Sequence, residues 1–185
     1  MWPLLCRRRP FATSAAGGGA AAAERLAVFA WGTASQGVLG LGPAAVDQYE
    51  PAEVEGLPSD IVSVGAGHFH SLAVTSDGGL WSWGRNKEWQ LGRPLAEGEH
   101  EHSPSPQLVA GGLERHSVAA ATGSGVATFV VTAEGLLYSF GSSKRGQLGL
   151  GTANAMSCAA RRIEVPGKVT QVSAGWGHAA ALLGE

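Results

Sequence analysis

Cysteine is scarce in this chain of 185 residues, which has only Cys6 and Cys158. Cys6 lies in an N-terminal segment that we expect to be removed, so a mature chain would keep Cys158 alone and form no intrachain disulfide. That usage is compatible with a reducing compartment. Long apolar runs are also missing, since none reaches the roughly 18 residues that a membrane-spanning helix needs. We therefore expect no membrane span.

Charge is sparse too. Charged residues make up 15% of the chain, and beyond the N-terminal segment 1–26 dense basic pairs occur only at Lys144-Arg145 and Arg161-Arg162. Proteins that hold nucleic acid through its phosphates usually carry a basic patch. Direct nucleic-acid binding is therefore not expected, while membership of an RNA-linked complex stays open.

The sequence lacks the usual signatures of catalysis. It has no serine nucleophile motif and no set of three or four zinc ligands with the usual spacing. The glycine runs at 37–42 and 146–151 do not have the spacing of a phosphate-binding loop, and no helix is predicted after either. We expect no enzyme, no cofactor and no metal site.

The N-terminal segment 1–26 is rich in arginine, alanine and serine, and the first acidic residue is Glu24. This composition is typical of an organelle-targeting presequence and lacks the apolar core of a secretory signal. Arg9 precedes Phe11 by two residues, as in a mitochondrial processing site that is cleaved after Phe11. Loss of residues 1–11 would leave 10 basic against 15 acidic residues, a net charge of −5. We expect a disordered presequence over 1–26 and a mitochondrial matrix location, with the plastid as the alternative.

Glycine, in contrast, is abundant at 28 residues and punctuates a β-rich pattern. Residues 61–64 and 71–75 are predicted to be strands, and residues 80–83 a returning strand. Between the last two, Ser76-Asp77-Gly78-Gly79 is predicted to be a hairpin turn. A similar stretch spans 118–141, and a third begins after Val169 and ends with the chain.

A glycine-rich loop follows each returning strand, which supports the same repeat independently. The returning strands end at Gly32, Gly84 and Gly141, at similar intervals along the chain, and the loops read GTASQGVLGLG, GRNKEWQLG and GSSKRGQLGLG. A period of about 50 residues with this much glycine predicts an array of similar β-sheets, as in a propeller. The expected fold class is all-β.

We expect an incomplete β-propeller of about two and a half to three blades over residues 27–185. Its units would span about 33–84, 85–141 and an incomplete 142–185. Residues 27–32 would be an orphan strand that closes a blade begun elsewhere. Residues 48–60 are expected to be an extended linker, and residues 97–106 an exposed, mobile insertion.

Two sets of side chains are predicted to pack inside the blades. His70 and His178 occupy equivalent repeat positions, with Ala127 between them, and are expected to be buried imidazoles that hydrogen-bond backbone across the blade. His68 and His70 are too few ligands for zinc. The tryptophans on returning strands are expected to pack between blades: Trp31, Trp81 and Trp83.

Trp89 replaces a glycine that the other two loops have at positions 37 and 146. An aromatic residue there should lose the left-handed backbone conformation and project from the rim, where aromatic anchors dominate binding interfaces. Packing on a neighbouring loop or on residues 97–106 is the alternative. The predicted partner-binding set consists of this residue and the basic residues of two loops: Trp89, Arg85, Lys87, Lys144 and Arg145.

The segments WSWGRNKEWQLG, FGSSKRGQLGLG and SVGAGHFHSLAVTSDG resemble the regulator of chromosome condensation repeat family. Members of that family fold as seven-bladed β-propellers with blades of about this length. The resemblance covers residues 27–185, and the leader makes the chain similar to a mitochondrial member, with a plant member as one option. Seven blades need roughly 350 residues, so the chain resembles a truncated member, with exposed sheet edges that favour aggregation or self-association.

The resemblance implies three functional hypotheses. The first is a non-enzymatic scaffold whose rim loops hold proteins of mitochondrial gene expression, either RNA processing or ribosome assembly. The second is a guanine-nucleotide exchange factor, which distorts a partner GTPase and needs no nucleophile of its own. The third is a truncated product without independent activity.

Overall fold

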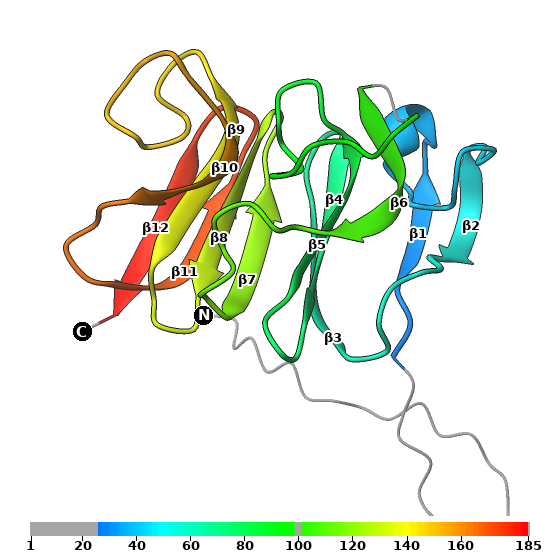
Figure 1. The fold of residues 1–185 in the computed structure, drawn as a ribbon, viewed down its shortest axis with the longest axis horizontal. Helices are drawn as coiled ribbons and strands as arrows, with labels where there is room; N and C mark the ends of the chain where they lie inside the picture. The colour runs from blue at the N-terminus through cyan, green and yellow to red at the C-terminus, as the bar shows by residue number, and fades with distance from the viewer. Residues whose placement is uncertain (1–25, 99–100, 185) are drawn as a thin grey trace, which may run out of the picture.

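The structure is a computed structural model that describes residues 26–98 and 101–184. These residues form twelve β-strands, one short 3-10 helix (η1, Ser35–Gly37) and no α-helix. Within the same ranges no helix is long and apolar enough to cross a membrane. The predicted presequence lies outside the described residues except for Leu26. Four antiparallel sheets lie side by side in a row (Figure 1), which confirms the all-β, partial-propeller prediction.

Two of the sheets have four strands in simple meander order. The first contains β3 (Ile61–Ala66), β4 (His70–Thr75), β5 (Leu80–Arg85) and β6 (His102–Leu108). The second contains β7 (Val118–Gly123), β8 (Ala127–Thr132), β9 (Leu137–Ser143) and β10 (Ala155–Ile163). The predicted turn after β4 is present, and Gly78 has φ +88° there, a conformation that glycine adopts without steric cost.

The two outer sheets have two strands each. One pairs β1 (Phe29–Gly32) with β2 (Gln48–Glu53), and the other pairs β11 (Lys168–Ala174) with β12 (Ala179–Gly184). One expectation is wrong here: residues 48–60 are not only a linker, because they contain β2. β2 also gives the strand at 27–32 a partner that follows it in the chain, whereas no described strand precedes and pairs with it, as expected.

The expected mobile insertion at 97–106 is also wrong over its second half, while residues 99–100 lie outside the described residues. Residues 102–106 belong to β6, which pairs with β5, and Ser103 is fully buried opposite Gly84. β6 is the last strand of its sheet. Proline fits such an edge strand because one side of the strand has no ladder to donate to. Pro104 and Pro106 therefore interrupt the sequence pattern without interrupting the strand.

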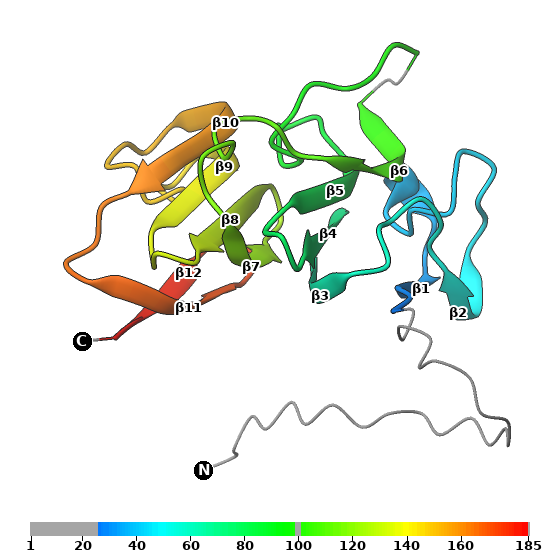
Figure 2. The same ribbon diagram turned by 60° about the horizontal axis from the view of Figure 1, so that its bottom comes forward.

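Small residues allow the sheets to approach closely along β3, β7 and β11, which lie together on one side of the row (Figure 2). A Cβ atom at Gly65 would lie 2.7 Å from the carbonyl oxygen of Ala121. Backbone bonds join successive sheets at equivalent places: the Val118 amide donates to the Gly78 carbonyl (3.0 Å) and the Val169 amide donates to the Gly135 carbonyl (2.9 Å). The sequence repeat is thus a repeat of sheet-to-sheet contacts.

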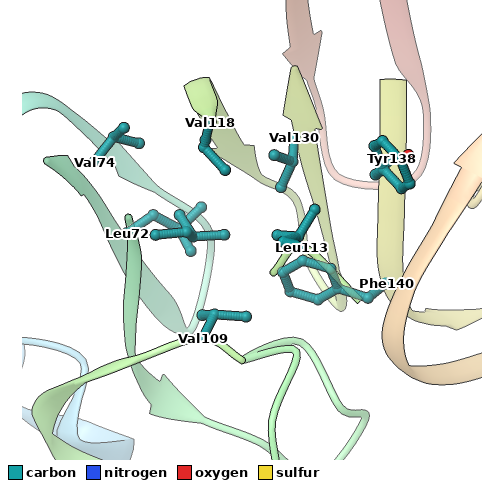
Figure 3. Packing of buried hydrophobic residues seen from close by; sticks show 9 residues of the cluster. Leu72, Val74, Val109, Leu113, Val118, Val130, Tyr138 and Phe140 are labelled. Carbon is teal, nitrogen blue, oxygen red and sulfur yellow. The ribbon is translucent and has the colours of Figure 1, made fainter. Parts of the chain in front are cut away.

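The largest core lies between the two four-stranded sheets (Figure 3). Leu72 and Val74 on β4 face Val130 on β8 and Phe140 on β9 across this core. Face-to-face packing explains why these strands are apolar almost continuously and do not alternate.

The tryptophan prediction holds for Trp83, which is 2% exposed, while Trp81 packs at the edge of the same cluster. It is wrong for Trp31, which is 62% exposed. Trp31 lies on β1, and the described residues supply no strand for the free edge of β1. Burial of a returning strand therefore depends on the rest of its sheet.

Candidate protein-binding surface

Six connections lie at one end of the sheets, because connections in an antiparallel meander alternate between its two ends. We call this end the loop face. It consists of the short connections 67–69, 124–126 and 175–178 and the long loops 33–47, 86–98 and 144–154. Figure 1 shows the long loops at the top of the row. All the predicted partner-binding residues lie on or beside this face.

Glutamine and asparagine side chains, buried at Gln90 and Asn86 and half-buried at Gln147, hold two of the long loops in place. In the loop after β5, Gln90 Oε1 accepts the Glu88 amide (3.0 Å) and Asn86 Oδ1 accepts the Leu91 amide (3.0 Å). In the next loop, Gln147 Oε1 accepts the amides of Lys144 and Arg145 (3.1 and 2.7 Å). These bonds satisfy backbone donors that water would otherwise have to reach, so both loops present their side chains from a fixed frame.

Trp89 contradicts one part of its prediction. Its φ is +63°, close to +69° at Gly37 and +78° at Gly146, so the left-handed conformation is kept. The Trp89 amide donates to the Asn86 carbonyl (3.0 Å), and its carbonyl accepts the Gly92 amide (3.1 Å). These backbone bonds fix the left-handed conformation at position 89, so a tryptophan there must adopt it just as glycine does. The indole is 36% exposed, so it lies partly on the loop face.

The predicted basic residues differ in their electrostatic surroundings. Arg85 is paired with Glu88 through two bonds (Nε–Oε2 3.0 Å, Nη2–Oε1 2.7 Å), and Lys87 Nζ lies 3.6 Å from Glu101 Oε1. Lys144 and Arg145 are exposed, and no acidic side chain in the described part of the chain pairs with them. Uncompensated positive charge on the loop face therefore comes from the loop after β9.

The structure adds an aromatic row that the sequence reasoning missed. The guanidinium of Arg85 lies 5.2 Å from the centre of the Phe69 ring. His68 makes edge-to-face contacts with Phe69 (4.0 Å between centroids) and Trp176 (4.6 Å). Trp176 is 67% exposed. The row, defined as Arg85, Phe69, His68 and Trp176, joins the connection after β3 to the one after β11.

Backbone bonds hold this row in place across three sheets. The His68 amide donates to the Ser124 carbonyl (3.0 Å), and the Gly125 amide donates to the Trp176 carbonyl (3.4 Å). One sequence signal was available: Trp176 stands between Gly175 and Gly177, outside any strand that would bury it. Exposed tryptophan and arginine are the residues most enriched at binding hot spots.

His70 connects the loop face to the core. It is fully buried, as predicted, but its partner is a side chain and not backbone: Nε2 lies 2.8 Å from Thr128 Oγ1 on the next sheet. Thr128 Oγ1 donates to the Gln90 carbonyl (2.7 Å), so the imidazole must donate from Nε2, and its buried Nδ1 has no hydrogen-bond partner among the described residues. Burial lowers the pKa of His70 from 6.5 to about 4. His178, expected to be buried likewise, is exposed.

Comparison with known proteins divides the chain into the same repeats. The family model for the regulator of chromosome condensation (RCC1) repeat matches residues 27–74, 77–130 and 134–182. The chain is 37% identical over 128 residues to the human probable E3 ubiquitin-protein ligase HERC6, covering 69% of this chain and 12% of that protein. It is 34% identical over 136 residues to the Arabidopsis thaliana RCC1 domain-containing protein RUG3, mitochondrial, covering 70% of this chain and 29% of that protein.

Among solved structures, Prp20p from Saccharomyces cerevisiae superposes with a TM-score of 0.71 at 24% identity, covering 87% of this chain and 40% of that one. This similarity shows the fold. The chain spans less than a third of the length of either curated relative.

Proposed function

Because the chain belongs to the regulator of chromosome condensation (RCC1) repeat family, we propose that it is a non-enzymatic scaffold that binds a protein partner through its loop face. The observation that carries this proposal is the aromatic row, with Trp176 67% exposed at one end and Arg85 at the other. Rigid aromatic side chains on a fixed frame lose little conformational entropy on binding. Lys144 and Arg145 supply positive charge for an acidic rim on the partner.

We place this scaffold in the mitochondrial matrix, in a complex of organelle gene expression. The composition of residues 1–26 and the mitochondrial designation of the RUG3 relative support the location. The link to RNA processing or ribosome assembly rests on the family resemblance. Any RNA would be held mainly by other members of the complex, because the dense basic pairs of this chain are few.

Quantitative capture from mitochondria tests the proposal. The full chain carrying Trp176→Ala or Trp89→Gly should fold normally and retain at most about a tenth of the wild-type partner signal, as expected for a lost anchor. Tyr49→Ala is the matched control, because Tyr49 is an exposed aromatic residue (95%) on β2, away from the row. Equal capture by wild type and both tryptophan variants would refute the loop face as the binding surface.

A second candidate function is guanine-nucleotide exchange on a GTPase. The observation in its favour is the fold similarity to Prp20p, whose structure is described together with its binding to Gsp1p and histones. Such a protein would accelerate release of labelled GDP from candidate mitochondrial GTPases in a purified mixture. Clear acceleration that Trp89→Gly abolishes would favour exchange over simple scaffolding, and unchanged release would exclude it for the GTPases tested.

A further inference from the structure

The loop that carries Trp89 is held to the neighbouring sheet by a buried hydroxyl. Thr128 on β8 is fully buried, and its Oγ1 donates to the carbonyl of Gln90 (2.7 Å), 38 residues away along the chain. The carbonyl of the next residue, Leu91, accepts the hydroxyl of Ser82 (2.8 Å) from the loop's own sheet. These two neighbouring carbonyls therefore tie the loop to both of the complete sheets.

The same contact occurs one repeat earlier. Ser71, Thr128 and Ala179 correspond to one another, because they follow the equivalent positions 70, 127 and 178. Ser71 Oγ donates to the Val38 carbonyl (2.8 Å), and Val38 holds the same place in the first long loop as Gln90 holds in the second. Each complete sheet thus holds the loop that precedes it at the same carbonyl. Ala179 has no hydroxyl, so the contact depends on the residue and not on the fold alone.

The side chain of Gln90 extends this contact to the surface. Its Oε1 accepts the Glu88 amide (3.0 Å), and its Nε2 donates to Glu88 Oε2 (3.3 Å). The Glu88 carboxylate in turn accepts the two bonds of Arg85, whose guanidinium lies over the Phe69 ring. Trp89 stands between Glu88 and Gln90, so both of its neighbours in the chain are fixed.

His70 closes this network from inside the protein. Its Nε2 donates to Thr128 Oγ1 (2.8 Å), and this leaves the hydroxyl hydrogen for the Gln90 carbonyl. His70 directly follows Phe69, whose carbonyl accepts the Arg85 amide (2.8 Å). The bonds thus form a closed path from the buried imidazole through the junction of the two sheets to the loop face and back. Hydrogen bonds in such a path polarise one another, so the loss of one weakens the others.

We propose that Thr128 is a positioning residue of the loop face. Being fully buried, it touches no partner itself. It sets the orientation of Trp89 and Arg85 by holding their loop against the second complete sheet. By linkage, any change that separates the two sheets also loosens these two side chains, and a partner bound to them favours the packed junction. The role in binding rests on the function proposed above, whereas the placement of Trp89 is measurable without a partner.

A purely stabilising role for Thr128 makes a different prediction. Thr128→Val keeps the shape of the side chain and loses both bonds, while Thr128→Ser keeps the hydroxyl. If the hydroxyl only stabilises the fold, the valine variant unfolds more easily, but its folded molecules hold Trp89 as the wild type does. If the hydroxyl positions the loop, the folded valine variant holds Trp89 in a different or mixed orientation.

Fluorine NMR of the full chain labelled with 5-fluorotryptophan separates these two roles. The Trp89 resonance is assigned as the one missing from Trp89→Gly. It should be single and sharp in the wild type and in Thr128→Ser, and should shift or split in Thr128→Val. Ser139→Ala is the matched control, because Ser139 is equally buried and its hydroxyl donates to the Leu148 carbonyl of the next loop (2.8 Å). An unchanged Trp89 resonance in folded Thr128→Val, or an equal change in Ser139→Ala, overturns the proposal.

Hydrogen exchange of the wild-type chain tests the same link without any substitution, and decides it if Thr128→Val does not fold. The amides of Glu88 and Leu91 should be protected to within about tenfold of the amides of β8, because their loop opens only when the junction opens. Urea should accelerate both sets in parallel. Loop amides that exchange faster than this, or independently of urea, overturn the proposal.

Capture from mitochondria tests the consequence for binding. Thr128→Val should retain at most about a tenth of the wild-type partner signal, as Trp89→Gly does, and Thr128→Ser should retain it in full. If Trp89→Gly and Trp176→Ala both capture normally, the proposed function fails, while the fluorine spectrum still decides the placement of Trp89. If these two variants lose the partner and folded Thr128→Val keeps it, the positioning role fails alone.

Discussion

Because the imidazole of His70 is neutral and buried, the free energy of unfolding of this protein should depend on pH. Its Nε2–H donates to Thr128, its Nδ1 has no partner in the described structure, and burial lowers its pKa from 6.5 to about 4. A proton added at Nδ1 would place a charge on a fully buried group whose Nδ1 accepts no hydrogen bond and donates none among the described residues. The folded state therefore resists a proton that the unfolded chain accepts readily.

The sign and size of the effect follow from linkage. Because the folded pKa is the lower one, the stabilisation is fully present above pH 6.5 and is lost as the pH falls toward about 4. The unfolded state binds more protons throughout that window. Between pH 7 and pH 5 this residue alone should remove about 2 kcal/mol from the free energy of unfolding.

Urea unfolding followed by tryptophan fluorescence measures this directly, at pH 7 and pH 5 and at one fixed chain concentration. His70→Gln keeps an Nε2–H donor for Thr128 but does not titrate. It should be about 1–2 kcal/mol less stable than wild type at pH 7, because its packing differs, and should lose about 2 kcal/mol less on acidification. His102→Gln, at the less buried start of β6, controls for general acid effects. Parallel pH profiles for wild type and His70→Gln would refute the argument.

Three further substitutions test the loop and sheet contacts. Gly92→Val should destabilise the fold by about 3 kcal/mol in chemical denaturation. Valine is strained at the φ of +68°, and its Cβ would lie 2.7 Å from the Phe140 ring. A decrease of less than about 1 kcal/mol in the free energy of unfolding would contradict this packing. Trp89→Gly should raise the free energy of unfolding by about 1 kcal/mol, because glycine adopts the φ of +63° found at Trp89 without strain. A lower melting temperature for this variant would mean that packing of the indole stabilises the fold by more than the backbone strain costs. Thr128→Val should cost about 2 kcal/mol, because it removes both bonds of the hydroxyl while keeping its shape; an unchanged denaturation midpoint would exclude a structural role for these bonds.

Several features were predictable because they depend on neighbours in the sequence. The turn at Ser76–Gly79, the apolar strands around it and the regular recurrence of this pattern along the chain follow from glycine conformations and side-chain pattern, and the structure reproduces them. The family followed from the same motifs. The fate of Trp89 did not follow, because the sequence rule for an aromatic in place of a glycine takes no account of the buried Gln90 and Leu91 that fix the loop.

The sequence by itself determined where the chain extends and where it turns, since alternation, β-branching and glycine act over a few residues. Only the tertiary structure decided which strands share a sheet: β6 joins β5 across a long loop, β2 joins β1, and the prolines of residues 102–106 are accepted because they fall at an edge. The aromatic row likewise brings His68 to Trp176, from a distant part of the chain. Burial of Trp31 and His178 depends on neighbouring strands that the local pattern does not specify, because a side chain is buried only when another part of a protein covers it.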